Sequence, residues 1–132
     1  MDESLLKALV EEQLGSVVFV MDYLQLDFSA ARFTAYVWPT VTIGDVILHF
    51  GDPGYRDALC AFIAHEVVAA EESSETGLMI RFGLGQIATN PGPTDLVGAE
   101  IAQLQVYEGP FQDASLTVWR PGEDVFAGRD WS

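Results

Sequence analysis

The sequence predicts an α+β fold in which one or two curved, mainly antiparallel sheets are accompanied by two helices. Residues 4–14 and 53–64 place apolar side chains at helical spacing on one stripe. Residues 17–50 and 66–120 instead contain short apolar segments with period-two alternation, bounded by turn-forming residues. Because 132 residues is the usual size of one domain, we expect residues 1–132 to fold as a single domain.

The two helices are predicted from their apolar stripes and from their ends. Gly15 follows the first stripe and suits a helix C-terminus. Asp52 can act as the N-cap of the second helix, and Pro53 fits its first position. The stripes consist of Leu5, Leu6, Leu9, Val10 and Leu14 in the first helix and of Tyr55, Leu59, Phe62 and Ile63 in the second.

Most of the remaining chain is predicted to form antiparallel strands. Gly44-Asp45 is a two-residue connection of the kind favoured in β-hairpins, and Gly83-Leu84-Gly85 is a second turn between strands. The polar residues 71–77 are expected to form an exposed loop. The expected strands cover residues 17–28, 32–38, 41–43, 46–48, 65–70, 78–82, 86–89, 101–107 and 115–120, and residues 121–132 are expected to be irregular.

Two parts of the chain share a pattern. Residues 24–28, with Phe33 five residues later, match residues 78–82, with Ile87 five residues later. Each predicted hairpin follows a helix and a valine-containing strand, so the pattern indicates two helix-plus-hairpin units that bury their apolar faces against each other. The alternative interpretation is that two unrelated hairpins look alike.

The charge of the chain limits its partners. Six basic residues stand against twenty acidic ones, which gives a net charge of −14. Such an excess repels the phosphates of nucleic acid, so no nucleic-acid partner is expected. The same field attracts a basic protein, although solubility alone also accounts for many acidic surfaces.

The sequence predicts a cytoplasmic protein that does not contact a membrane. Its first residues, Met1 to Ser4, lack the positive start of a secretory signal, and the longest apolar run, residues 58–64, is too short to span a bilayer. Cys60 is the single cysteine, so the chain cannot form an internal disulfide. This composition fits a reducing compartment.

No cofactor or metal site is predicted. The run Gly83–Ala88 matches the loose dinucleotide-binding pattern, but that pattern needs a helix that begins at the glycines, and residues 86–91 are a poor helix start. The sequence also has no P-loop, no nucleophile elbow and no calcium-loop pattern. We therefore expect none of these cofactors.

Three residues have side chains suited to catalysis, and a structural role is the stronger interpretation for each. His49 and His65 lack the spacing of a helical zinc pair, and His65 is placed to cap the second helix. Cys60 could act as a nucleophile with either histidine as its base. Its apolar neighbours favour a small buried side chain instead, so no catalytic residue is assigned.

Seven residues are candidates for binding a protein partner. The two acidic pairs do not match a catalytic carboxylate pair, because adjacent strand residues point to opposite faces and loop residues are usually solvated. They could form a negative patch for a basic partner, with aromatic rings as anchors, unless the rings fill the core or cover a sheet face. The candidates are Tyr36, Trp38 and Trp119 with Glu71, Glu72, Glu123 and Asp124.

A set of glycines, aromatic residues and apolar strand residues gives the chain a resemblance to other proteins. They are Gly77–Phe82, Gly85, Glu100 and Leu116–Gly122, with the start of the second helix and Ile63–Val67. In these residues the C-terminal two-thirds of the chain resembles a group of small bacterial proteins of unknown function. The resemblance implies a compact β-rich fold and carries over no activity and no site residue.

These observations leave three hypotheses about function. The leading hypothesis is a non-enzymatic acidic module that binds a basic protein, for example an immunity protein that neutralises a basic toxin. The second is a small-molecule-binding protein or enzyme with a pocket between the second helix and the sheet, where His49 or His65 transfers protons. The third is a structural homodimer formed through residues 32–38, whose two faces both carry apolar or aromatic groups.

Overall fold

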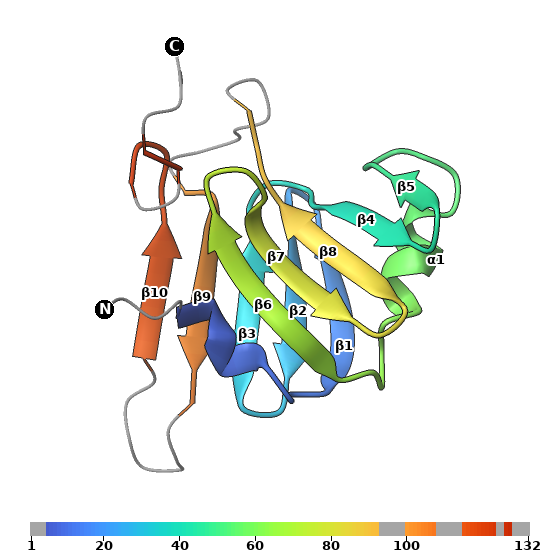
Figure 1. Cartoon of the computed structure of the whole chain (residues 1–132), viewed down its shortest axis with the longest axis horizontal. Helices are drawn as coiled ribbons and strands as arrows, with labels where there is room; N and C mark the ends of the chain where they lie inside the picture. Colours follow the sequence, from blue (N-terminus) through green and yellow to red (C-terminus); the bar gives the residue numbers. More distant parts are fainter. Residues whose placement is uncertain (1–4, 93–99, 108–114, 124–125, 128–132) are drawn as a thin grey trace.

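Two five-stranded antiparallel sheets pack face to face in the computed structural model (Figure 1). The structure describes residues 5–92, 100–107, 115–123 and 126–127. The first sheet has the strand order β1-β2-β3-β9-β10 and the second the order β5-β4-β8-β7-β6. The elements are η1 (Leu5–Leu9), β1 (Leu14–Val20), β2 (Tyr23–Phe28), β3 (Ala31–Ala35), β4 (Thr40–Ile43), β5 (Val46–Leu48), α1 (Tyr55–Cys60), β6 (Val67–Ser73), β7 (Gly77–Phe82), β8 (Gly85–Thr89), β9 (Ala102–Val106) and β10 (Ser115–Trp119).

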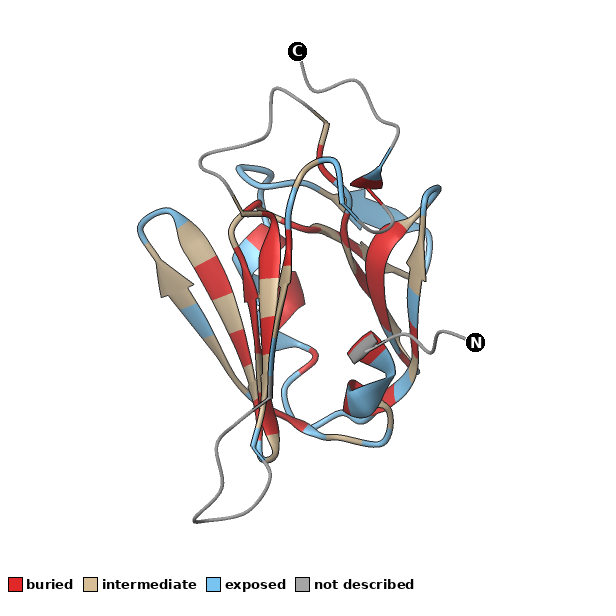
Figure 2. Ribbon diagram, turned by 90° about the vertical axis from the view of Figure 1, so that its left-hand side faces the viewer, coloured by how far each residue is buried: buried red, intermediate tan, exposed pale blue. Residues whose placement is uncertain are grey.

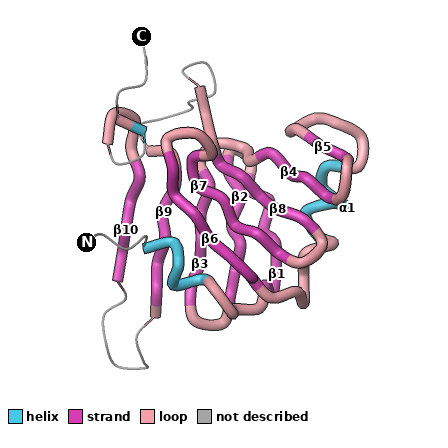
Figure 3. The backbone as a smooth tube through the Cα atoms, in the orientation of Figure 1, coloured by secondary structure: helices cyan, strands magenta, loops and turns pink. Residues whose placement is uncertain are grey.

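The predicted α+β class is wrong, because the described chain is mainly strand and its named helical elements, η1 and α1, are both short (Figure 3). The first, η1, is a 3-10 helix of five residues. Leu6 and Leu9 are buried three residues apart, and a 3-10 turn places this spacing on one side. Glu11 then adopts a positive φ of 76°, which ends the helix, and Leu14 reaches the core from the start of β1.

The second predicted helix, residues 53–64, is also shorter than expected. Gly54 precedes α1 with a φ of 87°, and no side chain caps the helix. Asp52 instead accepts a hydrogen bond from the backbone N–H of His49 at 2.7 Å, so it stabilises the turn before the helix. After the helix, Ala64 has a φ of 76° and its N–H donates to a carbonyl of β1. α1 is thus a short bridge between strands.

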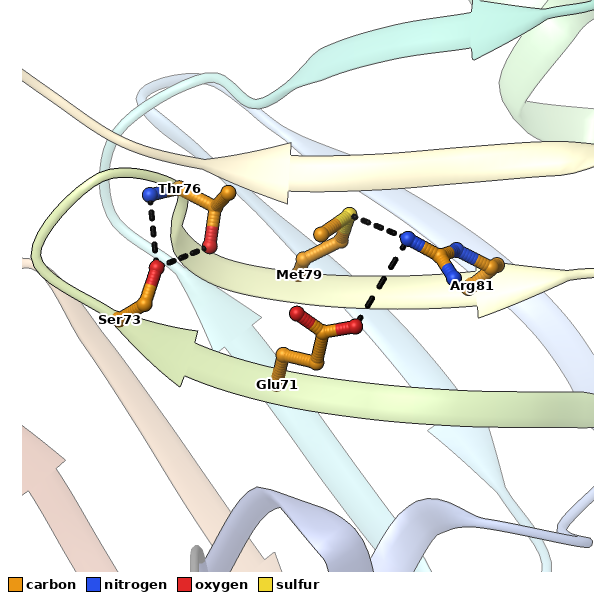
Figure 4. Close-up of polar contacts among 5 residues, drawn as sticks. All are labelled: Glu71, Ser73, Thr76, Met79 and Arg81. Atoms are coloured by element: carbon orange, nitrogen blue, oxygen red, sulfur yellow. Dashed lines mark hydrogen bonds and ion pairs between the residues drawn. The ribbon is translucent and has the colours of Figure 1, made fainter.

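The exposed loop predicted for residues 71–77 is largely strand. β6 continues to Ser73, and its pairing with β7 runs as far as Ser73 and Gly77. The remaining turn is closed by the Ser73 hydroxyl, which accepts a hydrogen bond from the Thr76 N–H at 2.9 Å (Figure 4). Glu71 and Glu72 therefore lie in a paired strand, where alternation sends their side chains to opposite faces.

The order of the strands shows that the two halves of the chain share one plan. β1-β2-β3 are neighbours in the first sheet, and β6-β7-β8 are neighbours in the second. The hairpin after each trio joins the opposite sheet, where β4 pairs with β8 and β9 pairs with β3. The repeated unit is therefore a three-strand meander with an exchanged hairpin, which corrects the predicted helix-plus-hairpin unit.

The shared sequence pattern falls on matching places in this plan. Leu26 in β2 pairs with Phe33 in β3, and Ile80 in β7 pairs with Ile87 in β8. All four side chains are buried in the core between the sheets. The pattern thus marks the inner apolar face of each meander.

Figure 2 shows the sandwich as two separate layers. Helical segments lie at its two open sides. On one side, α1 contacts β4 of the second sheet and β1 of the first, and buries Tyr55, Ala58 and Leu59. On the other side, η1 packs against β6. Phe126, from the C-terminal segment predicted to be irregular, is also buried in this core.

The predicted hairpins are confirmed, and one of them depends on a glycine. β4 and β5 pair across Gly44-Asp45, and β7 and β8 pair across the turn that contains Gly83. A Cβ atom at Gly85 would lie 2.1 Å from the carbonyl oxygen of Thr42 in β4, whereas one at Gly83 would meet nothing within 4 Å. Gly85 therefore permits close backbone packing within the sheet.

We expect Gly85→Ala to lower the free energy of unfolding by about 1–3 kcal/mol, because the backbone of β4 would have to move away. Gly83→Ala, the matched control in the same turn, should change it by no more than about 0.5 kcal/mol. Urea titration of both variants measures the difference. Equal effects of the two substitutions would contradict the close packing of β8 against β4.

Candidate interaction surface

The residues predicted to bind a partner do not share one surface. Tyr36 lies on the outer side of the first sheet, where its ring is 5.7 Å from that of Tyr23. Desolvation raises the pKa of the Tyr36 phenol, and the negative charge of Glu100 adds to the effect. Glu71 projects from the outer side of the second sheet (Figure 4). These two candidates are thus on opposite faces of the sandwich.

Glu72 and Trp119 form an internal contact between the sheets. Trp119 on β10 is only 1% exposed, and its indole N–H donates to Glu72 Oε1 at 3.0 Å. The other carboxylate oxygen accepts the backbone N–H of Leu6 in η1 at 3.3 Å. This carboxylate connects β6, β10 and η1, so the structure removes Trp119 from the surface anchors and gives Glu72 a structural role.

The remaining acidic candidates lie near arginines. Glu71 Oε2 is 3.7 Å from a guanidinium nitrogen of Arg81, which also contacts the sulfur of Met79 (Figure 4). Glu123 lies 4.0 Å from Arg120. Asp124 is outside the described residues. The predicted negative patch is therefore not assembled from these pairs in the part of the chain that the structure describes.

Trp38 is the predicted anchor that leads to a different surface. It lies between β3 and β4, half-buried, and its ring stacks on Phe50 with centroids 4.4 Å apart and planes 19° apart. Phe50 in turn meets the edge of Tyr55 at 6.0 Å. Three rings from three segments thus form one cluster beside α1.

Arg56 extends this cluster to the first sheet. Its guanidinium carbon lies 5.9 Å from the ring centroid of Phe50 and 5.8 Å from that of Phe19 in β1. Arg32, Arg81 and Arg120 each contact a carboxylate, whereas Arg56 lies over two aromatic rings. A guanidinium over aromatic faces is held by cation–π attraction and keeps donors for a further partner.

Exposed apolar side chains adjoin the cluster on β5, the edge strand of the second sheet. Val46 and Ile47 are more than half exposed, and Phe50 is 49% exposed. We call the surface formed by Trp38, Val46, Phe50 and Arg56, together with Ile47 on the outward-facing side of the same edge strand, the corner patch. The exposed carboxylates Asp45, Asp52 and Asp57 come from the same segments, so the patch has an apolar and aromatic centre with acidic neighbours.

Tyr55 holds α1 in place beneath the corner patch. Its side chain is buried, and its hydroxyl donates to the carbonyl oxygen of Pro39, just before β4. Burial raises the pKa of this phenol, and the charge of Arg56 partly opposes the shift. The neutral, hydrogen-bonded form is therefore the one that fits the folded structure.

The residues considered for catalysis are on the outside. His49, Cys60 and His65 are all exposed, which corrects the expectation of a buried Cys60. His49 Nδ1 lies 3.6 Å from Asp52. Facing inward, α1 presents buried side chains that belong to the core, so the histidines do not line a pocket there. The described residues include no group of three His, Cys, Asp or Glu side chains arranged to hold a metal.

Replacing Glu72 by alanine should lower the free energy of unfolding by about 1–3 kcal/mol, because the buried indole N–H of Trp119 loses its acceptor. Glu71→Ala removes a neighbouring carboxylate that is half exposed, and should change stability by no more than about 0.5 kcal/mol. Guanidinium unfolding followed by tryptophan fluorescence compares the two. A Glu72→Ala variant as stable as Glu71→Ala would show that the carboxylate does not join the sheets.

Tyr55 should make the fold sensitive to alkali. Its pKa is raised in the folded state, so the stabilisation is complete below its ordinary value of 10.0 and declines as the pH rises above that value towards the folded-state pKa. The stability advantage of the wild type over Tyr55→Phe should therefore shrink above pH 10. Denaturant titrations at neutral and alkaline pH measure this difference. An advantage that is constant with pH would contradict the effect of burial on this phenol.

Comparisons of this chain with protein-family models, with curated proteins and with solved structures gave no match. Among the described residues, no helix is long and apolar enough to cross a membrane. The geometry and charge of the corner patch are therefore the features of the chain that bear on its function.

Proposed function

We propose that this chain is a non-enzymatic protein-binding module that docks a basic protein on the corner patch. The observation that carries the proposal is an exposed cluster of aromatic, aliphatic and arginine side chains at one edge of the second sheet, with three exposed aspartates in the same segments. We place this activity in the cytoplasm, since the single cysteine fits a reducing compartment.

The composition of the corner patch supports docking. Protein interfaces are enriched in aromatic residues and arginine at their centres and are polar at their rims. Trp38, Phe50 and Arg56 supply such a centre, and the stacking of Phe50 on Trp38 fixes one ring before a partner arrives. A preformed anchor reduces the ordering cost of binding, so these residues are suited to carry most of the affinity.

The charge of the chain supports a basic partner. Asp45, Asp52 and Asp57 are exposed and come from the segments that form the patch, and the whole chain has a net charge of −14. A field of this sign accelerates the approach of a positive surface and repels acidic competitors. An immunity protein that neutralises a basic toxin is one function that needs this property.

The backbone of β5 offers a second means of recognition. Ile43 and Val46 close the two-residue turn, so they form the first hydrogen-bonded pair of the hairpin. Because pairing alternates along an antiparallel ladder, the N–H and C=O of Ile47 point away from β4. A partner strand can pair with Ile47 while its side chains contact Phe50, as in β-strand addition.

The proposal is tested by capturing partners from native lysate with the full chain, Ile47→Asp and Val68→Asp as baits. The two substitutions add the same charge to edge strands of one sheet, at positions that are 59% and 56% exposed. We expect a basic protein retained near one to one by the wild type and Val68→Asp, released by moderate salt, and lost with Ile47→Asp. Phe50→Ala should weaken its retention by about tenfold or more, as loss of an anchor does.

Either of two results would contradict docking at the corner patch. One is retention of the same basic protein by Ile47→Asp and by the wild type at equal level. The other is retention that is independent of salt, which would remove the electrostatic basis of the interaction.

A further inference from the structure

The acidic residues of the described chain are concentrated at the ends and edges of the sandwich. Asp22, Asp45 and Glu75 lie in turns between strands, and Glu11 and Glu66 lie where the two sheets are joined. The outer face of the first sheet differs from these acidic ends and edges. Its described strands place one carboxylate there, Asp27, and the guanidinium of Arg32 on β3 pairs with it.

This neutral face consists of polar and aromatic side chains arranged in rows across the strands. The middle row contains Gln25, Thr34 and Gln103, which are aligned by the pairing of β2, β3 and β9. Two residues further along the same strands lie Asp27 and Arg32 on one side of the row and Tyr23 and Tyr36 on the other. The Tyr36 hydroxyl is 3.5 Å from Gln103 Oε1, so the rows are in contact.

We propose that the outer face of the first sheet is the interface of a homodimer, and that its occupant is the same face of a second copy of this chain. Two copies that each carry a net charge of −14 repel each other in most orientations. Repulsion is lowest between faces without net charge, and the outer face of the first sheet is one such face. This interface is independent of the corner patch, which lies at an edge of the other sheet.

The rows are self-complementary about a two-fold axis that lies in the interface and runs across the strands at the glutamine row. In that arrangement each strand faces its own copy in the opposite direction, apart from the rotation that sheet twist imposes. Arg32 then faces Tyr36 of the second copy, and Asp27 faces Tyr23 of the second copy. The first pair is suited to cation–π contact and the second to a hydrogen bond from phenol to carboxylate. Glutamine amides, which both donate and accept, face each other in the middle.

The outer face of the second sheet lacks these features. It is also close to neutral, since Glu71 and Arg81 pair with each other. Its central strands carry small residues there, including Ala69 and Ala88, and its exposed Ile47 lies on the edge strand β5, where it belongs to the corner patch. The first sheet instead adds Leu116, an exposed side chain on β10 beside the rows. A single sheet face is smaller than a standard interface, so we expect a weak dimer in the micromolar range.

Sedimentation equilibrium of the full chain, from a few micromolar to several hundred micromolar, measures this dimer. We expect a mass that rises towards twice that of the monomer, and an association that strengthens with added salt because the repulsion is screened. Gln25→Glu places like charges opposite each other and should weaken the dimer by about tenfold or more. Gln86→Glu makes the same change at a half-buried position on the outer face of the second sheet and should leave the dimer unchanged.

A charge-swap pair makes the geometry testable. An equimolar mixture of Gln25→Glu and Gln25→Lys chains should form a heterodimer more stable than either variant alone, because the two-fold axis brings the two positions together. A monomer mass at every concentration would overturn the proposal. So would a dimer that Gln86→Glu weakens as much as Gln25→Glu does, or a mixture that associates no better than its components.

Discussion

The architecture depends on closing the two open sides of a sandwich whose sheets share one apolar layer. On one side the closure is a single carboxylate, Glu72, which accepts the buried N–H of Trp119 and the backbone N–H of Leu6. A polar group at such a place is stable only when its partners satisfy it, so β6, β10 and η1 fix one another. Glu72 and Trp119, which the sequence suggests as partner-binding residues, therefore hold the two sheets together.

The side of the sandwich at α1 is closed less completely. α1 has six residues and is about 9 Å long. The neighbouring strand β1 is far longer, because its seven residues are extended. Arg56 covers part of the difference by lying over Phe19 and Phe50, while β5 keeps exposed apolar side chains. A partner gains most where a fold leaves its own apolar surface uncovered, which relates the corner patch to the shortness of one helix.

The hairpins were predictable because their signals are local. Gly44-Asp45 and the glycine turn at residue 83 lie between alternating segments, and both hairpins form. The long helices failed because an apolar stripe does not specify how its residues reach the core. Leu6 and Leu9 do so from a 3-10 turn and Leu14 from a strand, since the segment before β1 hydrogen-bonds to residues fifty positions away, such as Glu66 and Val67.

The candidate site was predicted only through Trp38. Phe50 and Ile47 are recognisable as surface residues once β5 is known to be an edge strand, and the strand order depends on the exchange of hairpins between the halves. The roles of Glu72 and Trp119 likewise require β6 and β10 to lie on the same side of the sandwich. Such contacts between distant segments leave no local pattern in one sequence.

The exchange of hairpins also bears on how the two halves of the chain are held. Each half supplies two strands to the sheet of the other, and the halves are joined through the exposed residues 51–54, which lie outside every strand. Cleavage of this link would therefore leave two fragments held by intact ladders of hydrogen bonds, the situation used in fragment complementation. The covalent connection acts chiefly by keeping the halves at high effective concentration, and an association of two shorter chains could build the same sandwich.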